Sequence, residues 1–300
     1  MKKKLFYGTG VALITPFKQD KTVDFESLGR IVSHCIDGNV DYFVVLGTTG
    51  ESVTLSHSEK QQVVRYVTEQ TKGKIPIVIG IGGNDTAGII DTIKQTDFSA
   101  IAGILSVAPY YNKPTQAGII AHFKAIAAAS PVPVILYNIP GRTGINMTVE
   151  TTLELAQETN IAGIKEASGI LSQMMKIIAG KPEDFVVISG DDVLTLPLIA
   201  AGGGGVISVA ANAYPHEMSA LVTDALTGNF TQAREHHYRL LPLFEAQIAD
   251  GNPAGIKAAL HIMGKVENVL RLPLVPVSAK IYEQIELIVK GIGSEPNYTF

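Results

Sequence analysis

The chain of 300 residues contains a single cysteine and no tryptophan. Cys35 therefore has no partner for an intrachain disulfide, and no group of cysteines and histidines has the spacing of a zinc site. These absences are typical of proteins in a reducing compartment. We expect a cytoplasmic protein that contains no structural metal.

Long hydrophobic runs and basic tracts are also scarce. No apolar run reaches the ~18 residues that are needed to cross a bilayer. The net charge is −4, and the only lysine-rich tract is at residues 2–4, so neither nucleic acid nor a membrane is expected as a partner. This tract resembles the start of a signal peptide, but Gly8, Gly10 and Pro16 interrupt the apolar part that follows. We expect no such signal.

Short apolar segments that alternate with helical patterns are the main feature that is present. We expect strands at residues 10–15, 42–46, 76–81, 101–107, 134–137, 161–165, 185–189 and 206–210. Strands that alternate with helices predict a parallel sheet, and eight such units within ~250 residues predict an α/β fold of the (β/α)8 TIM-barrel type. The barrel is expected over residues 1–228. Residues 229–300 are expected to form a C-terminal helical segment packed on the barrel.

One helix has a clear start signal. Ser56 and Glu59 have the spacing of a capping box, in which each side chain binds the backbone amide of the other residue. A helix is therefore predicted from Ser56 to about Thr71.

Lys165 ends the sixth predicted strand, which is an unusual place for a lysine. Burial disfavours the ammonium form, and the resulting neutral amine can attack a carbonyl group to form a Schiff base. In the alternative interpretation, Lys165 extends to solvent and pairs with Glu166. Active sites of these barrels lie at the carboxyl ends of the strands. The ends of the other predicted strands carry a set of polar residues that favours Lys165 as a nucleophile, namely Thr48, Thr49, Tyr110, Tyr111, Tyr137, Arg142 and Asp191.

Six motifs at the predicted strand ends and within the strands occur in an order that matches a known family. They are GTTGES at 47–52, PYYNKP at 109–114, YNIPGRTG at 137–144, GIKE at 163–166, SGDD at 189–192 and GVIS at 205–208. Over essentially its whole length the chain resembles the dihydrodipicolinate synthases, which belong to the N-acetylneuraminate lyase family of Schiff-base barrels. The resemblance implies a lyase that condenses pyruvate with L-aspartate 4-semialdehyde on the diaminopimelate route to lysine, with no cofactor.

The resemblance also implies a catalytic group. Lys165 would form the imine with pyruvate, and Tyr137 would act as acid and base beside it. Tyr137 would connect through Thr48 to Tyr111, which in the family reaches into the site of a neighbouring subunit. A chain of hydroxyl groups can relay a proton because each is both donor and acceptor. The protein is accordingly expected to be a homotetramer, arranged as a dimer of dimers.

Three further residues match substrate-binding positions. Thr49 and the main chain of Ile207 would contact pyruvate, and Arg142 would bind the carboxylate of the aldehyde in bidentate geometry. The sialic-acid lyase branch lacks this arginine, so Arg142 favours the synthase. Two alternatives stay open: another pyruvate-dependent aldolase or lyase that acts on a sugar acid, and a barrel that only senses pyruvate-like ligands.

Members of the family that lysine inhibits bind it near a dimer interface. The matching positions that fit this pattern are Ser52, His57, Asn84 and Tyr110. Gly88 replaces the expected glutamate, and Lys60 stands where many inhibited members have histidine. The first change removes a charge-assisted bond to an ammonium ligand and the second adds repulsion, so we expect weak or absent inhibition by lysine.

The acidic pair Asp191 and Asp192 is not expected to bind a metal. Carboxylates near the start of a helix interact favourably with its dipole, and we expect both residues to open a helix.

Overall fold

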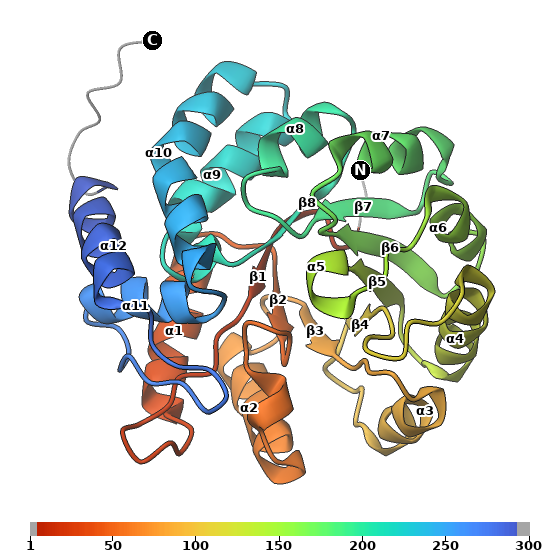
Figure 1. Ribbon diagram of the computed structural model, residues 1–300, viewed down its shortest axis with the longest axis horizontal. Helices are drawn as coiled ribbons and strands as arrows, with labels where there is room; N and C mark the ends of the chain where they lie inside the picture. Colours follow the sequence, from red (N-terminus) through yellow and green to blue (C-terminus); the bar gives the residue numbers. More distant parts are fainter. Residues whose placement is uncertain (1–4, 293–300) are drawn as a thin grey trace.

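The structure, a computed structural model, describes residues 5–292. Residues 1–4, with the lysine-rich tract, and residues 293–300 lie outside the described part. Eight parallel strands follow one another in chain order around a closed barrel (Figure 1). The strands are β1 (Gly8–Ala12), β2 (Tyr42–Val45), β3 (Ile77–Gly80), β4 (Gly103–Val107), β5 (Val134–Asn138), β6 (Ile161–Glu166), β7 (Val186–Ser189) and β8 (Gly205–Ser208). The predicted (β/α)8 fold is confirmed.

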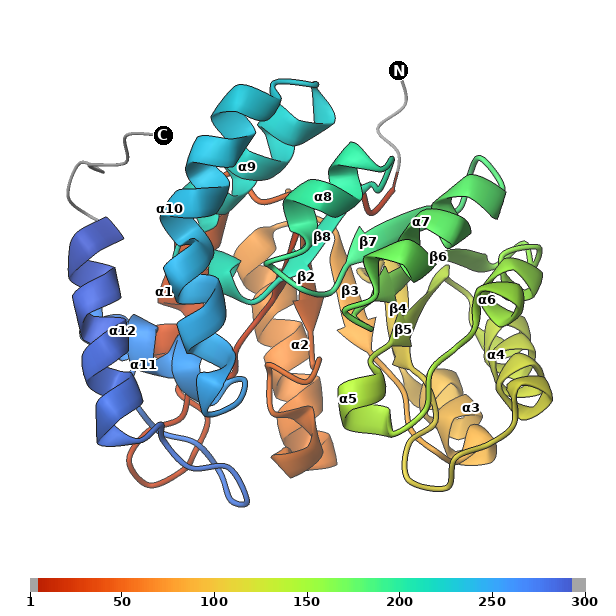
Figure 2. The same cartoon turned by 45° about the horizontal axis from the view of Figure 1, so that its top comes forward.

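The helices lie on the outer side of the barrel, except the short α5 (Pro140–Thr143), which lies over the strand ends (Figure 1 and Figure 2). They are α1 (Phe25–Asp37), α2 (His57–Thr71), α3 (Thr86–Gln95), α4 (Gln116–Ala129), α5 (Pro140–Thr143), α6 (Val149–Leu155), α7 (Leu171–Gly180), α8 (Thr195–Ala200), α9 (Pro215–Leu226), α10 (Phe230–Ala249), α11 (Ala254–Ile262) and α12 (Ala279–Ile292). Two 3₁₀ turns are η1 (Ser52–Thr54) and η2 (Ala210–Asn212).

The strands separate two layers of core. Successive side chains of a strand point to opposite faces, so each strand contributes to both layers. In β2, Val44 packs with inward-facing residues of the other strands, whereas Phe43 and Val45 pack against the surrounding helices. Because both faces are covered, these strands consist largely of apolar, often β-branched residues.

The helix α2 begins where the capping box predicts. The Ser56 hydroxyl accepts a hydrogen bond from the amide of Glu59, and the Glu59 carboxylate accepts one from the amide of Ser56. The helix ends at Thr71, as expected.

The first and last strands end earlier than predicted, because certain backbone amides beyond them donate hydrogen bonds to side chains and not to a neighbouring strand. The segment predicted at 10–15 leaves the sheet after β1, and the amide of Ile14 donates to the side chain of Asn212. The segment predicted at 206–210 ends at Ser208, because the next two amides donate to the carboxylate of Asp192.

Helices α10, α11 and α12 follow the barrel. They lie on the side of the molecule where α1 and α9 are found, and α10 packs against both α9 and α12 (Figure 1). The change from α9 to α10 falls near residue 228, and the division of the chain at that residue stays a prediction. None of the helices within residues 5–292 combines the length and the apolar character that are needed to cross a bilayer.

Closure of the barrel between β8 and β1 requires glycine at position 205. Gly205 has φ 142°, and a Cβ atom there would overlap the carbonyl group of Gly8. We expect Gly205→Ala to lower the free energy of unfolding by about 3 kcal/mol or more, since backbone strain and overpacking add. Gly228→Ala, at φ 84° with open space around it, is the matched control and should cost about 1–2 kcal/mol. Urea unfolding midpoints measure both, and equal shifts would contradict the close approach.

Candidate active site

Lys165 and Tyr137 lie side by side at the carboxyl ends of neighbouring strands. They are paired in the register of β5 and β6, and their side chains therefore project from the same face of the sheet. The Lys165 Nζ atom lies 4.4 Å from the centroid of the Tyr137 ring. The exposed fractions of the two residues are only 5% and 6%. The sequence reasoning placed both residues in one site, and the fold brings them together.

Burial changes the acidity of the Lys165 amine. Removal from water lowers its pKa to about 8, with a further decrease from the guanidinium of Arg142 and an opposing increase from the carboxylate of Asp192. A usual lysine has a pKa near 10.4, so Lys165 presents a much larger fraction of neutral amine near neutral pH. The neutral amine is the form that acts as a nucleophile.

The alternative pairing of Lys165 with Glu166 is wrong. Glu166 is fully buried and points away from the lysine side of the strand. Its carboxylate accepts hydrogen bonds from Asn138 Nδ2 (3.0 and 3.2 Å), the Ser168 amide (2.7 Å) and Gln173 Nε2 (3.1 Å). These bonds connect the lysine strand to β5 and α7.

Tyr137 has a proton that is held firmly at neutral pH. Burial raises the pKa of its hydroxyl to about 12, against the opposing effects of the Arg142 charge and of a hydrogen bond with Thr48. The phenol can therefore donate a proton beside the Lys165 amine. Thr48 lies near enough to Tyr137 to affect this pKa, and the relay that would connect the two hydroxyls stays a prediction.

A groove of about 1060 Å³ runs from this end of the barrel along α2 and α3 to the segment that precedes β4. Seven of the residues expected at functional sites line it, namely Thr48, Ser52, His57, Asn84, Tyr110, Tyr137 and Arg142. Lys165 contacts Tyr137 but does not itself line the groove, and Thr49 and Ile207 are buried at 3% and 1% exposure. Tyr111 is 88% exposed and has φ 74°. The fold thus brings the predicted residues together, except that Tyr111 faces outward.

Asn252 joins two of the predicted residues and was missed by the sequence reasoning. Its Nδ2 atom donates to Thr49 Oγ1 at 2.9 Å, and its backbone carbonyl accepts from the Arg142 guanidinium at 3.1 Å. The residue follows α10, more than a hundred residues from Arg142, and no motif around it indicated a role at the strand ends.

The expectation that both acids of the pair at 191–192 open a helix is wrong. Helix α8 begins only at Thr195. The Asp192 carboxylate is buried and accepts from the amides of Val209 (3.2 Å) and Ala210 (2.9 Å) and from Gln247 Nε2 (2.8 Å). Asp192 therefore ends strand β8 and supplies the negative charge that opposes the lowering of the Lys165 pKa.

The residues expected for lysine binding share the groove with those of the candidate active site. Asn84 Nδ2 donates to the carbonyl of Tyr110 at 3.1 Å. Gly88 and Lys60, the two departures from the inhibited pattern, also line the groove. A response to lysine stays a prediction.

The fold and the site define a class of protein, the (β/α)8 barrels whose strand ends carry a buried lysine amine beside a tyrosine hydroxyl. Comparison with known sequences narrows this class, because the profile of the Dihydrodipicolinate synthetase family matches residues 5–292. The chain belongs to that family.

Individual relatives agree over nearly the full length. A 4-hydroxy-tetrahydrodipicolinate synthase from Flavobacterium psychrophilum is 51% identical over 289 residues, which covers 96% of this chain and 99% of the relative. The solved dihydrodipicolinate synthase from Thermotoga maritima is 41% identical, with a TM-score of 0.94 and coverage of 96% and 99%. The Acinetobacter baumannii enzyme, solved with pyruvate, is 37% identical, with a TM-score of 0.93 and the same coverage of the two chains.

The pKa of Lys165 responds to two neighbouring charges. We expect competitive labelling with an acylating reagent, followed by peptide mapping, to give Lys165 a pKa near 8. Arg142→Met should raise that pKa, because a like charge is removed, and Asp192→Asn should lower it. The labelling of the exposed Lys94 and Lys290, on the outer helices α3 and α12, serves as the internal reference. A Lys165 value that does not move in either variant would contradict this electrostatic description.

Proposed function

We propose that the protein is a lyase, a 4-hydroxy-tetrahydrodipicolinate synthase, which condenses pyruvate with L-aspartate 4-semialdehyde in diaminopimelate and lysine biosynthesis. The observation that carries the proposal is the buried Lys165 amine, with its lowered pKa, packed against the Tyr137 hydroxyl. Family membership and the names of the close relatives support the same activity.

The first half of the reaction uses the lysine. The neutral amine of Lys165 attacks the ketone carbon of pyruvate to form a carbinolamine, which takes up one proton and loses water to give an iminium ion. The positive charge acidifies the adjacent methyl group, and removal of one proton gives an enamine. Tyr137 is suited to exchange these protons, since it lies beside the amine and near Thr48.

The second half joins the two substrates. The enamine carbon attacks the aldehyde carbon of the second substrate and forms the new carbon–carbon bond, with a proton added to the resulting alkoxide. The amino group of that substrate then attacks the imine carbon and closes the ring. This step releases the Lys165 amine, so the enzyme needs no external cofactor in this mechanism.

Charged and polar groups around the groove suit the two carboxylates. Amides and hydroxyls of a tight turn form a small anion-binding site, and we assign the pyruvate carboxylate to the turn at Thr48 and Thr49, with the main chain of Ile207 nearby. Arg142 lines the groove and is assigned the carboxylate of the aldehyde.

The exposed Tyr111 supports assembly with further copies of the chain. In the proposed relay its hydroxyl serves the site of a neighbouring subunit, and the 88% exposure within one chain agrees with that role. A homotetramer built as a dimer of dimers, a cytoplasmic location and weak inhibition by lysine remain part of the proposal.

Trapping of the covalent intermediate tests the reaction. Incubation with pyruvate and sodium borohydride should produce a reduced pyruvyl adduct on Lys165, found by peptide mass spectrometry. The rate of trapping should rise with pH, reach half its maximum near pH 8 and level off at higher pH, where deprotonation of the amine approaches completion. Lys257, a second buried lysine that is paired with Glu51, should stay unmodified. An adduct elsewhere, or none, would remove Lys165 from the mechanism.

Arg142 separates the synthase from a sugar-acid lyase. We expect Arg142→Met to raise the KM for L-aspartate 4-semialdehyde by about 10- to 100-fold. This rise corresponds to the loss of a charge-assisted hydrogen bond that contributes ~1.5–3 kcal/mol. The pyruvate adduct on Lys165 should still form, and Arg142→Lys should retain part of the affinity. A sugar-acid substrate would be favoured if the wild-type protein turned over N-acetylneuraminate and not the semialdehyde. An unchanged KM of Arg142→Met for the semialdehyde would favour it as well.

A further inference from the structure

A second lysine, Lys257, forms a buried ion pair below the candidate active site. It lies in α11 among apolar residues, and its ammonium group donates to Glu51 Oε1 and to the carbonyl of Val269 at 3.0 Å. The side chains of Lys257 and Glu51 are both fully buried. The pair connects the loop after β2 to the C-terminal helical segment.

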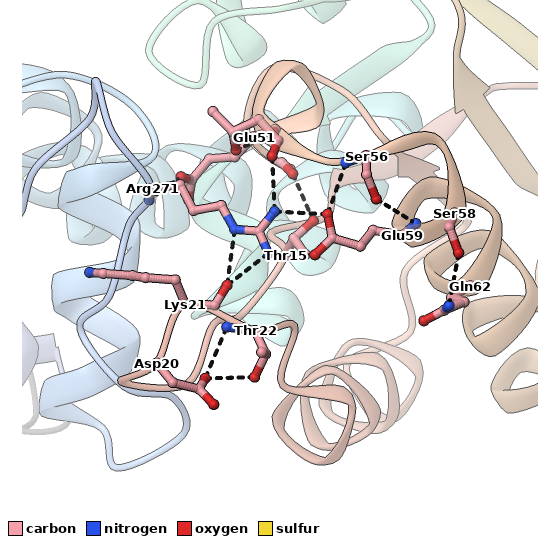
Figure 3. Close-up of polar contacts among 12 residues, drawn as sticks. Thr15, Asp20, Lys21, Thr22, Glu51, Ser56, Ser58, Glu59, Gln62 and Arg271 are labelled. Atoms are coloured by element: carbon pink, nitrogen blue, oxygen red, sulfur yellow. Dashed lines mark hydrogen bonds and ion pairs between the residues drawn. The ribbon is translucent and has the colours of Figure 1, made fainter.

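Arg271 completes the set of partners around Glu51. Its backbone amide donates to Glu51 Oε2 at 3.0 Å, so both carboxylate oxygens are bound by the C-terminal segment. Its guanidinium donates to the Glu59 carboxylate and to the carbonyls of Thr54 and Lys21, as Figure 3 shows. Arg271 thus binds Glu51, which precedes η1, and Glu59, which follows it.

An aromatic ring lies against both cations. The Lys257 Nζ atom is 4.2 Å and the Arg271 Cζ atom is 4.5 Å from the centroid of the fully buried Phe17. Contacts of this kind favour a desolvated cation. Phe17 follows β1, so three distant parts of the chain meet at this pair.

The same contacts hold the turn that follows β2. Glu51 stands two residues after Thr49 and has φ 50°, a left-handed conformation that is unfavourable for a residue with a side chain. The carbonyl of Gly50 accepts a hydrogen bond from Thr15 Oγ1 at 2.7 Å. Asn252, which lies five residues before Lys257, donates to Thr49 at 2.9 Å. The turn is therefore fixed by side chains from outside it.

We propose that Lys257, through Glu51, and the Arg271 side chain, through Thr54 and Glu59, are positioning residues. Together they set the Thr48–Thr49 turn and thereby the anchor for the pyruvate carboxylate and the partner of Tyr137. This inference rests on the proposed function. A buried ion pair is often no better for stability than a well-packed apolar pair, whereas it fixes the geometry of its partners. In this proposal the C-terminal helical segment positions residues of the active site.

Three variants separate positioning from simple stabilisation. Lys257→Met keeps the unbranched apolar part of the side chain and removes the charged amino group. Arg271→Gln removes the bonds to Glu59, Thr54 and Lys21 at a position that is partly exposed. The control is Asn160→Ala, because Asn160 Nδ2 donates to two carbonyls at the opposite end of the barrel, just before β6.

The main measurement is the pyruvate concentration that half-saturates the borohydride-trapped adduct on Lys165. We expect a rise of about 10- to 100-fold for Lys257→Met and of at least about 3-fold for Arg271→Gln, since a displacement near 1 Å has effects of this size. Amide hydrogen exchange in peptides that cover residues 47–55 should be faster in both variants. Asn160→Ala should lower the melting temperature and change neither measurement.

The outcomes are distinct. Lower melting temperatures with unchanged pyruvate dependence and unchanged exchange at 47–55 would show that the pair only stabilises the fold, and would overturn the inference. If Lys257→Met does not fold, Arg271→Gln decides by the same two measurements. If the wild-type protein forms no adduct, the proposed function fails, and hydrogen exchange alone then decides whether the pair holds the turn.

Discussion

Burial of the Lys165 amine at the end of a barrel strand is the constraint on which the chemistry depends. An ammonium group loses hydration inside the barrel, and the charged form is disfavoured unless a partner compensates. The Glu166 carboxylate is engaged by Asn138, Ser168 and Gln173. Asp192 compensates only in part, because its charge raises the pKa of Lys165 by less than burial lowers it; the backbone amides and Gln247 bind only its Oδ2 atom. The amine therefore stays easy to deprotonate.

The two buried lysines show how surroundings decide the role of one side chain. Lys165 is the last residue but one of β6 and packs against a tyrosine ring. Lys257 lies in a helix, with the Glu51 carboxylate and a backbone carbonyl as acceptors. Burial lowers the pKa of both groups to about 8. The lysine without a direct carboxylate partner lies beside the groove and is assigned the chemistry. Lys257, which is paired with Glu51, is proposed to position the Thr48–Thr49 turn.

Polar side chains at the strand ends accept hydrogen bonds from backbone amides, a role that the sequence motifs did not predict. Asn212 and Asp192 take up backbone amides where β1 and β8 leave the sheet, and so shorten the predicted strands. Buried amides need partners, and at these places the partners come from side chains. The same groups bring the C-terminal helix α10 into contact with the strand ends through Gln247.

Hydrophobic periodicity and local hydrogen bonding depend on near neighbours in the chain, and the barrel, the order of its strands and the capping of α2 could therefore be predicted from the sequence. The sequence also indicated Lys165, Tyr137, Thr48 and Arg142, since each follows or ends a strand and such ends meet at one rim. Asn252, Asp192 and the partners of Glu51 were decided only by the tertiary structure. Their contacts join residues separated by up to about two hundred positions, and no local pattern specifies which distant side chain will complete a buried hydrogen bond.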